Sequence, residues 1–384
     1  MAQALSKPDF DRHLREPGAV VYGRRSHWLI PHVDPVLTLL LLILMAAGLL
    51  VLYSASGRDM DQVQRQMLFM GAGLAAMSFA AQIPPRMLLR WSWLPYVLGT
   101  LLLVGVDLFG SGAKGAQRWL AIGPARFQPS ELLKIAVPLV LSAYFGSRLL
   151  PPRFKEVCLA VALLLVPLLL VAIQPDLGTA ILIGSGGAFV LFLAGIGMRY
   201  LAVALIGALT GAPALWFFAL HDYQKNRILT LLDPQQDKLG AGWNIIQSTT
   251  AIGSGGLTGK GWFQGTQSQL DFLPESHTDF IIAVLSEEFG FIAVLALLAL
   301  YMLIVVRGLI ISLAAPSMFG RLLAGSISLT FFLYVFVNMG MVAGLLPIVG
   351  VPLPMVSYGG TSVVTLCIGF GILMAVRSET DTRG

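Results

Sequence analysis

Runs of mostly apolar residues recur from residue 34 to residue 376, and no other feature constrains the fold of this chain as strongly. Ten such runs can be identified, most of them separated by short polar connections. A helix needs about 20 apolar residues to cross the hydrocarbon core of a bilayer. Only 12% of the residues are charged, against about 25% in an average soluble domain. The sequence therefore predicts an integral membrane protein and excludes soluble globular, disordered and disulfide-stapled secreted classes.

The predicted fold class is an all-α polytopic membrane protein with about ten transmembrane helices. The apolar runs lack the strict alternation of polar and apolar residues that a transmembrane β-barrel requires. A polar stretch precedes the first run and no small-residue cleavage site accompanies it, so we interpret this run as a retained helix rather than a signal peptide. The predicted spans have the approximate limits 34–53, 62–82, 91–109, 130–147, 156–173, 177–195, 199–219, 279–306, 321–346 and 357–376.

The distribution of Lys and Arg predicts that both termini lie in the cytoplasm. Short cytoplasmic connections of membrane proteins are enriched in these residues. With the N-terminus inside, most of the basic residues fall in the N-terminal tail and in short inner connections, and an even number of spans agrees. Residues 1–33 and 377–384 are then cytoplasmic tails, and residues 34–376 form the membrane domain. We attribute the net charge of +5 to orientation and to attraction by anionic lipids; it does not support nucleic-acid binding.

The longest connection, residues 220–278, is predicted to lie on the outer side and to be ordered. Its backbone is rich in glycine with interleaved Trp, Gln, Ser and Thr, and residues 223–233 have an amphipathic pattern. Long loops in compact proteins are usually functional or disordered. This composition suits an ordered surface that binds a polar ligand, and a flexible linker is the alternative interpretation.

A second outer connection, residues 110–129, has a charge pattern that runs against the predicted topology. It carries the three basic residues Lys114, Arg118 and Arg126. Since cations are expected mainly on the inner side, these three side chains are predicted to serve a local purpose on the outer side.

A few ionisable residues fall at membrane depth, where a charge is costly and a functional role is the default hypothesis. Glu131 and Lys134 are three residues apart, so they share a helix face and can pair. The alternative is an ion pair that only fixes helix packing. Asp176 lies between two apolar runs and could line a site or simply cap a helix. Asp279 opens the eighth predicted span.

The segment 347–362 contains three prolines and several glycines immediately before the last span. Prolines at this depth are typical of a broken helix or a re-entrant turn that faces a cavity. Ser357, Tyr358 and Thr361 are therefore candidates for lining such a cavity. The alternative is a rigid turn that only positions the last helix.

Carboxylates, cations and a polar loop around one apolar bundle suit a lipid substrate with a charged head group. Arg and Lys bind phosphates, and a carboxylate can act as general base on a sugar hydroxyl. The sequence contains neither a G-x-x-x-x-G-K-[ST] motif nor a plausible dinucleotide-binding strand–turn–helix. An outward-facing enzyme of this kind would need a donor that is already activated on its lipid, so no nucleotide cofactor is expected.

Three motifs resemble those of the SEDS family (shape, elongation, division, sporulation) of bacterial cell-wall proteins. They are WLAIGPARFQPSELLK (119–134), TQSQLDFLPESHTDFI (266–281) and PIVGVPLPMVSYGGTS (347–362). The resemblance extends over nearly the whole chain after residue 30 and is closest to the RodA branch of the family.

The resemblance implies a ten-helix peptidoglycan glycosyltransferase of the bacterial cytoplasmic (inner) membrane, with its active site on the extracytoplasmic side. Such a protein polymerises lipid II through β-1,4 bonds during cell elongation and rod-shape maintenance, and it releases undecaprenyl diphosphate. The acid of the H-T-D-F motif is the essential one in the family, and it falls on Asp279, which we assign as the base. Family residues that bind substrate fall on Trp119, Arg126, Glu131, Lys134 and Asp176. The residues themselves suggest two further candidates for substrate binding: Arg118, as a cation for the diphosphate, and Ser357, as a lining residue of the cavity.

The resemblance also implies partners and allows a divalent cation. The expected partners are lipid II, the glycan on undecaprenyl diphosphate, a class B penicillin-binding protein that acts as transpeptidase, and other membrane proteins of the elongation complex. Mg²⁺ or Mn²⁺ could stabilise a diphosphate leaving group, as could Arg and Lys, and the sequence shows no metal-ligand cluster. Two alternatives remain at this point: a lipid II flippase or transporter, and a non-catalytic scaffold for a transpeptidase.

Overall fold

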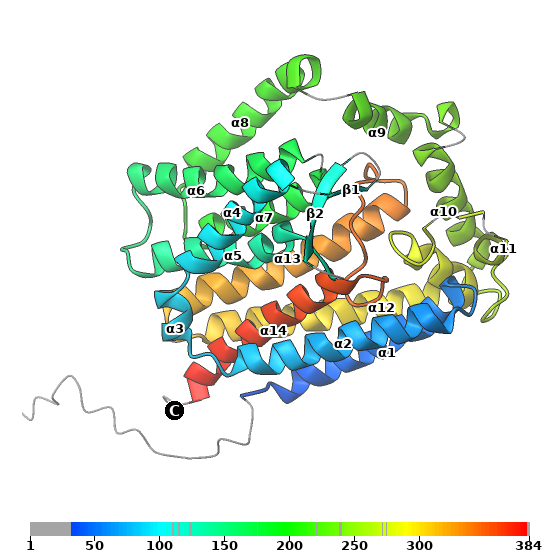
Figure 1. Ribbon diagram of the computed structural model, residues 1–384, viewed down its shortest axis with the longest axis horizontal. Coiled ribbons are helices and arrows are strands. Elements are labelled where there is room, and N and C mark those ends of the chain that lie inside the picture. Colours follow the sequence, from blue (N-terminus) through cyan, green and yellow to red (C-terminus); the bar gives the residue numbers. More distant parts are fainter. Residues whose placement is uncertain are drawn as a thin grey trace, which may run out of the picture. The chain divides into compact units, whose positions relative to one another are not determined.

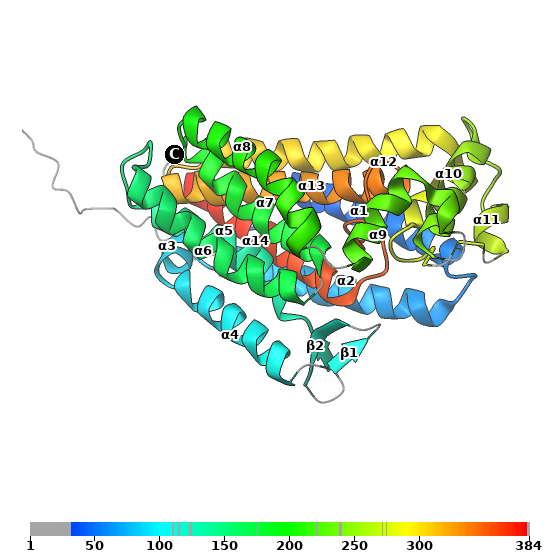
Figure 2. The same cartoon turned by 90° about the horizontal axis from the view of Figure 1, so that it is seen from above.

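The computed structural model describes residues 32–109, 111–113, 116–122, 125–174, 176–219, 222–237, 240–270, 272–273 and 275–381. Nearly all of the predicted N-terminal tail therefore lies outside the described residues. From residue 32 onward the chain is one compact unit, which is drawn in two views in Figures 1 and 2.

Helices make up most of the described chain. In order they are α1 (Pro35–Ala55), α2 (Met60–Ala81), α3 (Pro85–Arg90), α4 (Trp93–Phe109), α5 (Pro129–Gly146), α6 (Phe154–Ile173), α7 (Leu177–Leu193), α8 (Met198–Ala214), α9 (Asp222–Leu232), α10 (Ala241–Gly255), α11 (Thr266–Gln269), α12 (Ile281–Ala314), α13 (Met318–Val342) and α14 (Gly360–Asp381). A π-helical turn (Leu215–Ala219) extends α8, and a 3-10 turn (Pro234–Gln236) follows α9. Each of the ten predicted spans coincides with a helix, within a few residues at most ends.

Within the described residues, five helices are long and apolar enough to cross a bilayer. They are Pro35–Ala55, Phe154–Ile173, Ile281–Ala314, Met318–Val342 and Gly360–Glu379. Shorter apolar helices occupy Trp93–Val106, Leu177–Leu193 and Leu209–Phe218. The prediction of a helical polytopic membrane protein is confirmed, whereas ten as the number of crossings remains a prediction.

Several helix starts follow from local sequence chemistry. Asp34 precedes Pro35 and accepts hydrogen bonds from the backbone N–H groups of Val36 and Leu37, so it satisfies donors that a helix start leaves unpaired. Ser317 caps α13 in the same way. The start of α5 relies on Pro129, whose missing N–H costs nothing in the first turn.

The connections that the sequence predicts to be outer contain more regular structure than loops usually do. Three short strands form a small antiparallel sheet in the order β1 (Ser111–Ala113), β2 (Ala116–Ile122) and β3 (Ala125–Phe127), which the all-helical prediction did not include. The 220–278 connection contains α9, α10 and α11, and α9 coincides with the predicted amphipathic piece. This connection is therefore ordered where it is described.

Helix α12 starts two residues later than the predicted span and breaks at Gly290, which has φ of 75° and ψ of −174°. The backbone of 256–261 pairs with that of 287–292 across the break, for example through Lys260 N–H to Glu287 O at 3.0 Å. These bonds occupy backbone groups that the helix no longer pairs, which an apolar environment requires.

Packing places α14 along α2 and α1 along α12 (Figures 1 and 2). One ion cluster joins three of these helices. Asp34, whose side chain is fully buried, pairs with Arg307 Nη2 at 2.8 Å and with Arg377 Nη1 at 2.5 Å. Asp34 caps the start of α1, Arg307 belongs to α12 and Arg377 belongs to α14, so one carboxylate fixes three helix segments to one another.

We predict that Asp34→Asn lowers the stability of the protein. Asparagine still caps α1, but it removes the charge that Arg307 and Arg377 share, at a cost of about 2 kcal/mol. Thermal unfolding in detergent micelles should show a lower Tm. Asp59→Asn is the matched control, because Asp59 caps α2 but is part of no ion pair that the structure records. Equal melting of the two variants would contradict a stabilising role for the ion cluster.

Candidate functional site

A polar cavity of about 370 Å³ lies where β2, α5, α7, α13 and the segment leading into α14 meet. It brings together four of the residues that the sequence singled out as substrate-binding: Trp119, Glu131, Lys134 and Asp176. Its other lining residues are Gln128, Thr179, Leu182, Tyr334, Gly350, Val351, Pro352, Tyr358, Gly359, Gly360, Thr361 and Ser362.

A buried cation lies in the wall of this cavity. Lys134 Nζ is 2.6 Å from Glu131 Oε1 and also donates to the hydroxyl of Tyr334. All three side chains are buried. Oε2 of Glu131 is also buried and has no hydrogen-bond partner among the described residues. A buried charge is stable only when it is paired, so Glu131 keeps Lys134 charged at the cavity.

Asp176 both caps a helix and lines the cavity, so both interpretations of this residue hold in the structure. Its Oδ1 accepts from Thr179 N–H at 3.3 Å, and its Oδ2 accepts from Gln128 Nε2 at 3.0 Å. A Cβ on Gly178 would lie 2.8 Å from Val351 Cγ2 and within 2.9 Å of a backbone oxygen. Only glycine lets the start of α7 approach the cavity wall this closely.

The segment 347–359 is irregular backbone that side chains from α2 and α12 hold in place. Gln66 on α2 donates to Ser357 O at 3.1 Å and accepts from Gly359 N–H at 3.2 Å. Tyr301 on α12 donates its hydroxyl to Pro354 O at 2.6 Å. These bonds satisfy backbone groups inside the bundle, which is the condition for non-helical chain at membrane depth.

Ser357 does not line the cavity in this structure. It is 2% exposed, and its hydroxyl accepts from Leu353 N–H at 2.8 Å, which stabilises the turn from within. Tyr358 and Thr361 do line the cavity. Both interpretations of the sequence therefore hold for this segment, since it is a fixed turn and it also forms part of the cavity wall.

Asp279 lies in the turn immediately before α12, one residue ahead of Phe280, the N-cap of that helix. It is partly exposed. Its Oδ2 is 3.6 Å from the position that a Cβ on Gly350 would occupy, and Gly350 lines the polar cavity. The carboxylate that the sequence marks as the base is therefore at the edge of the cavity, next to its wall.

The predicted cations of the 110–129 connection can be placed only in part. Arg118 lies on β2 and Arg126 on β3, where Arg126 is paired in register with Ala121. The side chains of both arginines lie outside what the structure describes, and Lys114 lies outside the described residues altogether.

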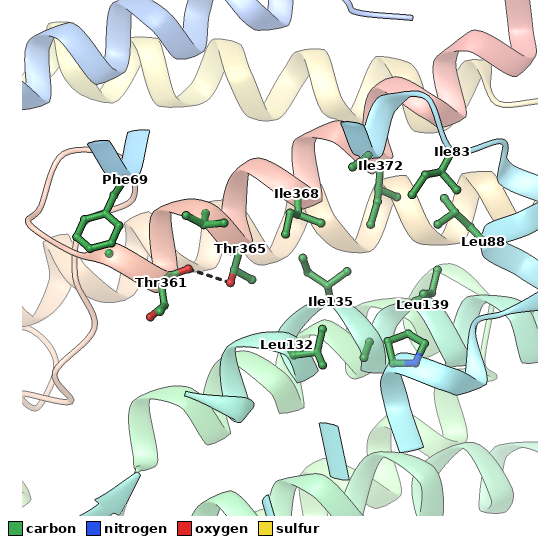
Figure 3. A pocket seen from close by; sticks show the side chains of 15 residues that line it. Phe69, Ile83, Leu88, Leu132, Ile135, Leu139, Thr361, Thr365, Ile368 and Ile372 are labelled. Carbon is green, nitrogen blue, oxygen red and sulfur yellow. Dashed lines mark hydrogen bonds between the residues drawn. The ribbon is translucent and has the colours of Figure 1, made fainter. Parts of the chain in front are cut away.

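An apolar cavity of about 380 Å³ adjoins the polar one and shares Gly360 and Thr361 with it. Figure 3 shows Leu132, Ile135 and Leu139 facing Ile368 and Ile372 across this cavity. Thr365 donates its hydroxyl to Thr361 O at 2.9 Å, so its polar atom is satisfied within α14. The two cavities together offer a polar and an apolar compartment that meet at the start of α14.

The described residues do not fit a metal site built from protein ligands alone. They contain no group of three or more His, Cys, Asp or Glu close enough to share one ion. Glu131 is already neutralised by Lys134, and Asp176 is engaged by Gln128 and the helix cap. A divalent cation would need oxygen ligands from a bound diphosphate.

Two residues of the site were not predicted from the sequence. Gln128 contacts Asp176, and Tyr334 contacts Lys134. One feature of the sequence could have indicated Gln128, because it is a polar residue directly before the helix that starts at Pro129. Tyr334 lies within an apolar run, where only its hydroxyl distinguishes it from a packing residue. Its contact with Lys134 spans 200 residues of sequence and depends on the fold.

Comparison with known proteins gives consistent results along the chain. The family model described as "Cell cycle protein", which covers FtsW, RodA and SpoVE, matches residues 35–382. Peptidoglycan glycosyltransferase MrdB of Escherichia coli (strain K12) is 52% identical over 357 residues, or 93% of this chain and 96% of that protein. The probable peptidoglycan glycosyltransferase FtsW of Geobacter metallireducens is 37% identical over 364 residues, or 91% of this chain and 96% of that protein.

Solved structures show the same fold. A chain of a peptidoglycan synthase complex, described as coordinating polymerization and crosslinking, has a TM-score of 0.80 at 32% identity and matches over 90% of this chain and 98% of that one. Rod shape determining protein RodA of Thermus thermophilus has a TM-score of 0.69 at 29% identity, over 92% of this chain and 98% of that one. On these matches, the resemblance seen in the three sequence motifs is confirmed, and the chain belongs to the FtsW/RodA/SpoVE family.

Proposed function

We propose that this protein is a membrane peptidoglycan glycosyltransferase that polymerises lipid II during cell elongation and rod-shape maintenance. The observation that carries the proposal is the junction of a polar, charged cavity with an apolar one at Gly360 and Thr361. A polyprenyl diphosphate sugar has the same two halves. The 52% identity to a peptidoglycan glycosyltransferase supports the reaction class.

The proposed reaction is a displacement at the anomeric carbon of the donor, which is the growing glycan on undecaprenyl diphosphate. The 4-hydroxyl oxygen of the acceptor lipid II forms a β-1,4 bond to that carbon. The bond from the carbon to the diphosphate oxygen breaks, and the leaving diphosphate takes the electron pair. Asp279 takes the proton of the acceptor hydroxyl.

The negative charge that develops on the diphosphate needs a cation in a dry environment. Lys134 supplies one at the cavity, and Glu131 and Tyr334 fix its position. A pre-oriented charge needs no reorganisation during the reaction, and such stabilisation is often the largest single contribution to catalysis. We assign Arg118 and Arg126 as further phosphate contacts and Trp119 and Asp176 as contacts to the sugars. A divalent cation bound to the diphosphate would supply additional charge.

The expected setting is the bacterial cytoplasmic membrane, with both termini inside and the polar cavity open to the outer side. We also propose a class B penicillin-binding protein and other elongation-complex membrane proteins as partners. The similarity to a chain of a complex that couples polymerization with crosslinking supports this assignment.

Asp279→Asn is predicted to reduce polymerisation of purified lipid II in detergent by about 10²–10⁴-fold, because the amide cannot accept the proton. Asp222→Asn, at an exposed acid on α9, is the matched control and should polymerise at the wild-type rate. Glycan length on gels and thermal stability should be measured for both variants. If folded Asp279→Asn still makes long glycans, the base is assigned wrongly. If the wild type moves lipid II across vesicles but makes no polymer in detergent, the protein is a flippase.

Ile368→Trp is predicted to weaken binding of lipid II by filling the apolar cavity. If the prenyl chain lies there, the loss of about two buried methylene groups at about 0.8 kcal/mol each raises KM about tenfold. A lipid II analogue with a short prenyl chain should be affected much less. Leu101→Trp, on the exposed face of α4, is the control. An equal rise in KM for both substrates would show that the chain lies elsewhere.

A further inference from the structure

Asn338 lies on α13, is completely buried and connects two backbone segments that are distant in sequence. Its side-chain amide nitrogen donates to Asp279 O at 2.9 Å and to Val351 O at 2.7 Å. One segment carries the proposed base. The other is the cavity wall between Gly350 and Pro352.

The chemistry of this position requires an amide. Two carbonyl oxygens converge on one side-chain atom, so that atom must donate twice, and the NH₂ of Asn or Gln has two hydrogens. If the side-chain amide of Asn338 were rotated by 180°, its oxygen would face both carbonyl oxygens and no hydrogen bond could form. The remaining atom, Oδ1 of Asn338, is buried and has no hydrogen-bond partner among the described residues. The side chain thus leaves its own acceptor unsatisfied while it makes both donor bonds.

The backbone around Asp279 depends on this bridge. In the first turn of α12, Ala283 N–H donates to Phe280 O at 2.9 Å rather than to Asp279 O. The carbonyl of Asp279 points instead to Asn338. The same turn is attached at a second point, where Tyr358 N–H donates to His277 O at 2.9 Å.

The other end of the bridge sets the distance between the carboxylate and the cavity. Gly350 has a φ of 76°, which favours glycine, and its Cβ position is 3.6 Å from Asp279 Oδ2. The next residue, Val351, accepts the bond from Asn338 and packs against Gly178 at the start of α7. A shift of Val351 would therefore move the cavity wall relative to both Asp279 and Asp176.

We propose that Asn338 is a positioning residue that holds the Asp279 carboxylate in register with the substrate cavity. This inference rests on the proposed role of Asp279 as base. Asn338 does not line the cavity, so it contributes little to substrate affinity. A misplaced base slows proton transfer while substrate still binds, because proton transfer needs near-hydrogen-bond geometry.

The test is steady-state polymerisation of lipid II by the full-length protein, with kcat and KM measured separately for Asn338→Leu and Asn338→Asp. Both variants remove the NH₂ donor; Asp keeps the side-chain volume, and Leu keeps the branch point at Cγ in a larger, apolar side chain. We expect kcat to fall about 10²-fold, with KM within about threefold of wild type. Ser326→Ala is the matched control, because Ser326 is a buried side chain of α13 that donates to Gly186 O at 2.7 Å, away from Asp279. It should keep kcat within about threefold.

Three results would overturn the inference. The first is an unchanged kcat in a folded Asn338 variant, and the second is a rise in KM that accounts for the whole loss. The third is failure of both variants to fold, which would make the bridge a purely structural element. Asp279→Asn is measured alongside. An active Asp279→Asn would refute the proposed base, whereas an inactive one together with unaffected Asn338 variants would refute only the positioning role.

Discussion

The pairing of Lys134 with Glu131 and Tyr334 is the interaction on which the rest of the site depends. A cation buried in an apolar bundle must be neutralised and hydrogen-bonded. Glu131 lies one turn before Lys134 on α5, and Tyr334 approaches from α13. The same pairing fixes α5 against α13, so the groups that keep the cation stable also form the wall of the polar cavity.

A second constraint is that irregular backbone inside a membrane domain must find partners for its N–H and C=O groups. The segment 347–359 meets it with side chains from α2, α12 and α13, namely Gln66, Tyr301 and Asn338. These bonds attach the segment to all three helices. A fixed position matters here because the segment lines the polar cavity and borders the turn that carries Asp279.

The sequence predicted what local chemistry determines. The apolar runs predicted the positions of ten helical segments, and the spacing of Glu131 and Lys134 predicted that the two side chains form an ion pair. Two kinds of feature could not be predicted from the sequence. The sheet of β1, β2 and β3 forms from short strands with no strong alternation, and Tyr334 and Asn338 resemble ordinary residues of an apolar run until the fold brings α13 to α5 and α12. Ser357 was chosen for its polarity, but its hydroxyl is used inside its own turn.

The central claim is that the two adjoining cavities hold the two halves of one lipid substrate. Photo-crosslinking tests it most directly, with lipid II that carries a photoreactive group either on the sugar or in the prenyl chain, followed by mass spectrometry of the adducts. The account predicts saturable sugar adducts at Trp119 or Tyr358 and prenyl adducts at Ile368 or Leu132, which line the polar and the apolar cavity respectively. Adducts of both probes confined to exposed helix faces, or no saturable labelling of either cavity, would contradict it.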